Sequence, residues 1–147
     1  MSLPVLFDTP DEAEQAFYTA FEQGDLEAMM QVWDEEDDVV CIHPMGRCLT
    51  GVQAVAHGWK AIFESGHSMR FQVQQRRFTR DEKLSVHTVI EHISHGTRLE
   101  NRSVVIATNI YKLTPFGWRI IVHHASPGGD EATEEGAARA TPAGRLH

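Results

Sequence analysis

Apolar residues recur along the chain with two different periods, and the change of period separates a helical first half from a β-rich second half. Between residues 9 and 23 the spacing is three or four positions, typical of a helix with one face in a core. That stripe consists of Ala13, Ala16, Phe17, Ala20 and Phe21. Thr9 as cap, Pro10 at the first helical position and Glu12 three residues after the cap predict its beginning, and Gly24 its end.

Two further helices and a short hairpin follow. Asp25 predicts the cap of a second helix, whose inward positions are Leu26, Met29, Met30 and Trp33. Short strands at 39–43 and 47–50 flank a Pro-Met-Gly turn. The third helix is expected from residue 52 to about 63, with one apolar face made by Val55, Trp59, Ile62 and Phe63.

From residue 69 onward the pattern shifts towards alternation, which predicts long strands at 69–79, 84–95, 99–113 and 118–127. Because the links are short, these strands should form an antiparallel meander, which twists and curls. The last strand should lie in the middle of the sheet. Residues 128–147 lack periodicity and predict a polar C-terminal tail, flexible or docked on a neighbouring surface, so residues 1–127 are expected to form a single domain.

The final strand carries the first candidate site. Strict alternation would place Trp118, Ile120, Val122, His124 and Ser126 on one face, which begins apolar and ends with an imidazole and a hydroxyl. We therefore predict that His124 acts as a general acid or base on a bound small molecule, with Ser126 beside it as a ligand-binding group. The alternative is a structural histidine that is hydrogen-bonded inside the core.

Other candidates for a ligand site lie on four further elements. His43 ends a short strand and could reach the mouth of the pocket with Cys41 beneath it. The helix residues Trp33, Trp59 and Phe63 could form an aromatic wall for a ligand, although ordinary core packing is the simpler explanation for each of them. Asn109 and Tyr111 share a face of the penultimate strand and could donate hydrogen bonds to a ligand carbonyl, and the sequence leaves open which face is concave.

Composition narrows the classes of partner and cofactor. A formal net charge of -8 argues against nucleic acid and anionic membranes as partners. No secretory signal and no apolar run of spanning length occur, so we expect a cytoplasmic protein with reduced thiols at Cys41 and Cys48. No native metal is expected either, because His87, Glu91 and His95 share a strand face but are spread too far along it for one ion. Gly-rich phosphate loops and GxSxG motifs are absent, which predicts no cofactor.

The order of elements and several motifs together resemble the NTF2-like superfamily, and within it the SnoaL-like and DUF4440-type small proteins. The resembling segments are FYTAFEQGD at 17–25, MQVW at 30–33, HPMG at 43–46, LTG at 49–51, WKAIF at 59–63, ATNIY at 107–111 and GWRIIVHHAS at 117–126. The resemblance implies an α+β cone, in which a curved antiparallel sheet wraps around three helices and leaves a cavity at its open end. It also implies a homodimer that pairs through the outer sheet faces.

Two functions of different classes follow from these observations. The first is a cofactor-independent isomerase, hydratase or cyclase acting on a small hydrophobic metabolite, with His124 as acid or base. The second is a non-catalytic ligand-binding or dimeric assembly module. The isomerase branch of the family uses a Tyr and a protonated Asp as an oxyanion hole together with an Asp base. The long strands here carry no convincing inward Asp, and Glu91 is the main acidic exception, which argues against steroid isomerase activity.

Overall fold

The computed structural model describes residues 5–36, 38–66, 68–96 and 102–129. The elements are α1 (Pro10–Gln23), α2 (Leu26–Val32), β1 (Val40–Ile42), β2 (Cys48–Thr50), α3 (Val52–Glu64), β3 (Met69–Arg80), β4 (Leu84–His95), β5 (Arg102–Thr114) and β6 (Gly117–Pro127). Almost all of the predicted tail lies outside the described residues, as does the start of the strand predicted at 99–113. Among the described helices, none has both the length and the apolarity needed to cross a membrane.

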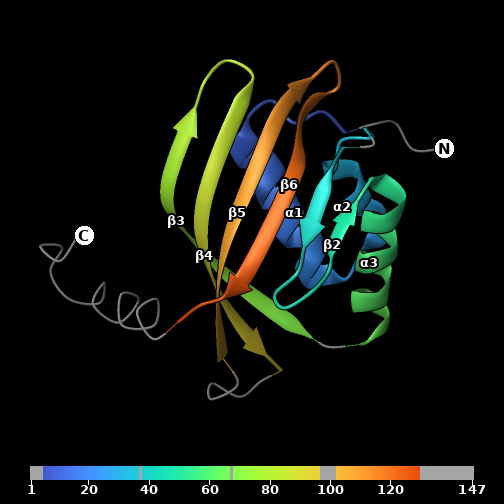
Figure 1. Ribbon diagram of the computed structural model, residues 1–147, viewed down its shortest axis with the longest axis vertical. Helices are drawn as coiled ribbons and strands as arrows, with labels where there is room; N and C mark the ends of the chain where they lie inside the picture. The colour runs from blue at the N-terminus through green and yellow to red at the C-terminus, as the bar shows by residue number, and fades with distance from the viewer. Residues whose placement is uncertain (1–4, 37, 67, 97–101, 130–147) are drawn as a thin grey trace, which may run out of the picture.

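The strands form one six-stranded sheet in the order β2-β1-β6-β5-β4-β3. Every neighbouring pair is antiparallel except β1 and β6, which run parallel. The sheet twists strongly, and the three helices lie against its concave face (Figure 1). This arrangement confirms the predicted α+β fold and the central position of the last strand, which pairs with β1 on one side and β5 on the other.

Local sequence signals set the helix ends. The Thr9 side chain accepts a hydrogen bond from the Glu12 backbone N–H (3.1 Å), and Gly24 adopts a left-handed conformation (φ 63°) that ends α1. Asp25 then caps α2 by accepting from the Ala28 N–H (3.0 Å). These tight ends fix the direction of α1 across the concave face, which decides which of its side chains meet the sheet.

A β-bulge in β6 changes which side chains of this strand face the core. Tyr111 pairs with Ile120 and Ile110 pairs with Val122, so Ile121 has no partner and the alternation shifts by one residue. After the bulge His123 faces inward and is buried, whereas His124 and Ser126 are exposed. The prediction that His124 and Ser126 share the inward face of Trp118 is therefore wrong, because it assumed strict alternation across this irregularity.

The bulge makes two adjacent histidines respond differently to substitution. His123→Ala should lower the free energy of unfolding by about 1–3 kcal/mol, because it leaves a buried partner without a hydrogen bond. His124→Ala should change it by less than about 0.5 kcal/mol, as expected for an exposed side chain. Urea unfolding of both variants measures the difference, and equal losses would contradict the assigned phase of β6.

Candidate functional site

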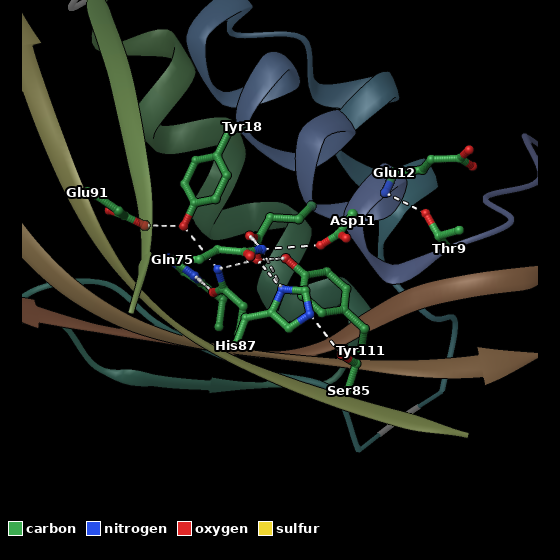
Figure 2. A network of polar contacts seen from close by, with 12 residues as sticks. Thr9, Asp11, Glu12, Tyr18, Gln75, Ser85, His87, Glu91 and Tyr111 are labelled. Carbon is green, nitrogen blue, oxygen red and sulfur yellow. Dashed lines mark hydrogen bonds and ion pairs between the residues drawn. The ribbon is translucent and has the colours of Figure 1, made fainter. Parts of the chain in front are cut away.

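A network of largely buried polar side chains connects α1 with the concave face of the sheet (Figure 2). The Glu14 carboxylate is its centre. Glu14 Oε2 accepts a hydrogen bond from the Tyr111 hydroxyl (2.7 Å), lies 2.9 Å from His87 Nδ1 and 3.4 Å from Asn109 Nδ2. Its Oε1 accepts from Gln75 Nε2 (2.9 Å). Three strands therefore supply the groups that surround a single carboxylate.

A second branch links Tyr18 of α1 directly to Glu91 of β4, and through Asn109 of β5 to His123 of β6. The Tyr18 hydroxyl donates to Glu91 Oε2 (2.5 Å) and accepts from Asn109 Nδ2 (3.0 Å). Asn109 Oδ1 lies 2.6 Å from His123 Nδ1. Because an amide oxygen only accepts, His123 Nδ1 must carry the proton in this contact. The branch thus links an acid, a phenol, an amide and an imidazole into one continuous chain.

The two buried carboxyl groups of the network ionise very differently. Burial opposes ionisation of Glu14, but hydrogen bonds from His87, Gln75 and Tyr111 outweigh it, so the pKa of Glu14 lies below its usual value. Burial raises the pKa of Glu91 to about 7, with the Glu14 charge adding to the effect and the Tyr18 hydrogen bond opposing it. Burial also raises the pKa of both Tyr18 and Tyr111 well above its usual value. At neutral pH the network therefore holds one carboxylate, one carboxyl in mid-titration and two neutral phenols.

His43, His123 and the Cys41 thiol stay uncharged at neutral pH. Burial lowers the pKa of His43 to about 4 and that of His123 to about 3. Burial likewise raises the pKa of the Cys41 thiol, whose Sγ lies 3.5 Å from His43 Nε2. Cys41 and Cys48 are both free thiols. A thiol kept in its neutral form is a poor nucleophile, so this corner of the site offers hydrogen bonds and packing.

The structure brings together only some of the residues predicted from sequence. Asn109 and Tyr111 do face the interior and join the network, and His43 contacts the Trp59 ring edge-on at 4.6 Å between centroids. Trp33 and Trp59 are buried core residues that pack around Phe17. Phe63 is partly buried against Trp59 and Phe21. A role for these aromatic rings in holding a ligand stays a prediction.

Sequence reasoning missed the helical half of the network. Glu14 and Tyr18 lie four residues apart on α1, which places them on one face of the helix, next to the apolar stripe. This spacing indicates a buried polar network, because a polar pair that borders a core-facing stripe needs polar partners on the opposing sheet. His87 and Glu91 were placed together on one strand face, and the structure shows what they meet there.

The network reaches a groove between α1 and β3 that has a volume of about 620 Å³. Glu14, Tyr18 and Gln75 contribute to its lining, together with Phe71 and Val73 of β3. A second hollow of about 540 Å³ lies between the end of α3 and the start of β3. In the described part of the chain, His, Cys, Asp and Glu side chains do not gather in threes or more in a way that could hold a metal ion.

A curved sheet wrapped around three helices, with polar groups gathered on its concave face, defines the class of NTF2-like α+β domains. A family model described as a SnoaL-like domain matches residues 11–129. The chain therefore belongs to the SnoaL-like family of NTF2-like proteins.

Solved structures and one curated protein show the same relationship. A Thiobacillus denitrificans protein, provisionally assigned as a calcium/calmodulin-dependent protein kinase type II association domain, is 40% identical, with a TM-score of 0.81 over 85% of this chain and 99% of that one. An NTF2-like protein of Streptomyces avermitilis, provisionally assigned as a dehydratase, is 27% identical, with a TM-score of 0.71 over 80% and 92% of the two chains. The F-box protein SKIP8 of Arabidopsis thaliana is 26% identical over 112 residues, which are 75% of this chain and 46% of SKIP8, so this chain spans about half of that relative's length.

The raised pKa of Glu91 predicts a specific pH dependence of stability. The folded state holds this proton up to about pH 7, whereas the unfolded state releases it near 4.5, so the free energy of unfolding falls as pH rises through that window. Glu91→Gln keeps an acceptor for Tyr18 and cannot ionise. As pH rises from 4 to 8, the free energy of unfolding of the variant should therefore increase relative to that of the wild type by on the order of 3 kcal/mol.

Denaturant unfolding of both proteins across this pH range measures the gain. His43 and His123 contribute an opposite slope, since stability due to a lowered imidazole pKa is lost as pH falls below about 6.5. Both proteins contain these histidines, so their contribution cancels in the difference. Glu64→Gln, an exposed change at the end of α3, serves as control. Parallel curves for wild type and Glu91→Gln would contradict the assignment.

Proposed function

We propose that this domain is a non-catalytic assembly module that forms a homodimer through the outer face of its sheet. The observation that carries the proposal is the apolar character of this face. Eight aliphatic side chains lie on it, from four neighbouring strands: Val40, Ile42, Val86, Ile90, Val104, Ile106, Ile110 and Val122.

These side chains form rows across the strands. Val86, Ile110 and Val122 are cross-strand partners in one row, and Ile90 pairs with Ile106 in another. Ile106 is 36% exposed in the single chain, although it is a large apolar residue. A row made of Thr88, Thr108 and His124 lies between these two apolar rows, and Ile90 is only 3% exposed. Apolar rows of this kind fit the core of a protein–protein interface that also contains polar groups, and a stable dimer needs about 800 Å² from each partner.

The state of the concave face supports an assembly role over a catalytic one. Aromatic rings pack in the interior, and the polar side chains there are hydrogen-bonded to each other, with only Glu14, Tyr18 and Gln75 of the network described above lining the groove between α1 and β3. The exposed, outward position of His124 also removes the residue that the sequence offered as acid or base. Isomerase, hydratase or cyclase activity on a hydrophobic metabolite therefore has less support. The 40% identity to the Thiobacillus protein, whose provisional assignment is an association domain, agrees with an assembly role.

Substitution on the outer face tests the proposal. The wild type should sediment as a dimer at micromolar concentration, and Ile106→Asp should shift it to the monomer, because a desolvated charge at the centre of the interface is costly. Met45→Asp is the matched control, since Met45 is 91% exposed in the turn between β1 and β2. Analytical ultracentrifugation with circular dichroism separates loss of assembly from loss of fold. A monomeric wild type, or an Ile106→Asp variant that stays dimeric, would overturn the proposal.

A further inference from the structure

The groove between α1 and β3 joins two features that the assembly role leaves unused. One wall is the free edge of β3, which is the last strand of the sheet among the described residues. The other wall is the face of α1 that carries Asp11, Gln15, Thr19 and Glu22. The groove is lined by α1, which lies on the concave face of the sheet, so a molecule bound there would leave the outer face free for a dimer.

The backbone of β3 faces this groove with hydrogen-bonding groups that β4 does not use. The Phe71 N–H donates to the Glu22 carboxylate (2.7 Å) instead of to a strand. Residues two apart on a strand present their backbone groups to the same edge, so Val73 and Gln75 also point their N–H and C=O groups towards the groove. Glu22 thus occupies the position that the carbonyl of an added strand would take.

The dimensions of the two walls agree with an extended segment of about five residues. From Phe71 to Gln75 the strand edge runs about 13 Å, at roughly 3.3 Å per residue. From Asp11 to Glu22 the helix runs about 16 Å, at roughly 1.5 Å per residue. Acidic side chains therefore stand near both ends of the groove, and the side chains of Phe71 and Val73 make its middle apolar.

We infer that this groove binds an extended basic segment of another protein, which adds to β3 as a further strand. Side chains of an added strand point alternately towards α1 and away from it. The pattern that fits is basic, any, apolar, any, basic: the two cations meet Asp11 and Glu22, and the apolar residue lies over Phe71 and Val73. When the segment binds, its carbonyl replaces Glu22 on the Phe71 N–H, which frees the carboxylate to pair with a cation.

Charge argues against the two other occupants of this edge. A second copy pairing through its own β3 would bring Arg70, Arg77 and Arg80 of the two strands close together, and like charges across a strand pair are destabilising. The four acidic residues of the chain's own segment 130–147 all lie in 130–135, and its two arginines, Arg139 and Arg145, are six positions apart with Pro142 between them, so the segment does not supply two cations at the required spacing of four. The fitting partner is therefore a basic segment in trans.

Fluorescence anisotropy with the full-length protein and labelled synthetic peptides tests this inference. The probe contains Lys-Thr-Val-Thr-Lys flanked by Gly-Ser, and it should bind more weakly as salt increases. Replacing both lysines by glutamate should weaken binding roughly tenfold or more. Methylating the five backbone nitrogens of the motif keeps the charge but removes every N–H that could pair with β3 in either strand direction, and should weaken binding to a similar extent.

Variants of the groove connect any binding to these residues. Asp11→Asn and Glu22→Gln should each weaken binding of the lysine probe by roughly threefold or more. Glu82→Gln, a change of the same charge at the exposed turn between β3 and β4, should leave it unchanged. Equal binding of the lysine and glutamate peptides, or of the unmodified and N-methylated peptides, would overturn the inference. Groove variants that bind the lysine probe as well as wild type does would also overturn it. Self-association of Glu22→Gln would overturn it too, because Glu22 would then serve only to prevent pairing of β3 between copies. None of these readouts depends on the dimer.

Discussion

The burial of the Glu14 carboxylate is the constraint on which the arrangement of the interior depends. A carboxylate removed from water is costly unless several donors surround it, and the donors here come from β3, β4 and β5. Their hydrogen bonds outweigh the effect of burial and keep the pKa of Glu14 low. Because the donors stand on separate strands, α1 can satisfy Glu14 in only one register against the sheet. The buried charge of Glu14 therefore fixes the position of α1 on the sheet, in addition to any contribution that it makes to stability.

The charge of Glu14 also explains the state of the second acid. Glu91 is equally buried but has a single close donor, Tyr18, and its ionisation would add a second negative charge to the same interior. Two carboxyl groups that share one poorly hydrated region rarely ionise together. One of them therefore keeps a proton to near neutral pH, and the Tyr18 hydroxyl between Asn109 and Glu91 links this proton to the rest of the network.

Elements with strong periodicity and end signals could be predicted from the sequence, and the site could be predicted only in part. Thr9, Glu12, Gly24 and Asp25 act locally, so the helices were found nearly to the residue. The direction of His124 depends instead on a pairing irregularity in β6, which arises between strands and leaves no pattern in the chain itself. Glu14 was missed for a similar reason, because its partners lie 61 to 97 residues away.

The two faces of the sheet and the free edge of β3 carry different kinds of side chain. The concave face is occupied by aromatic rings and hydrogen-bonded polar groups, and the outer face carries aliphatic side chains on four strands, with a polar row between them. At the other end of the sheet the short strand β2 is exposed at Cys48 and Thr50 and limited to three residues, which gives an added strand little to pair with. β3 is four times as long as β2. Its edge is not covered by α1, whose carboxylates line the groove beside it. The free edge of β3 is long, is open on one side and has charged side chains beside it. Such an edge favours pairing with a segment of opposite charge over pairing with the same strand of a second copy.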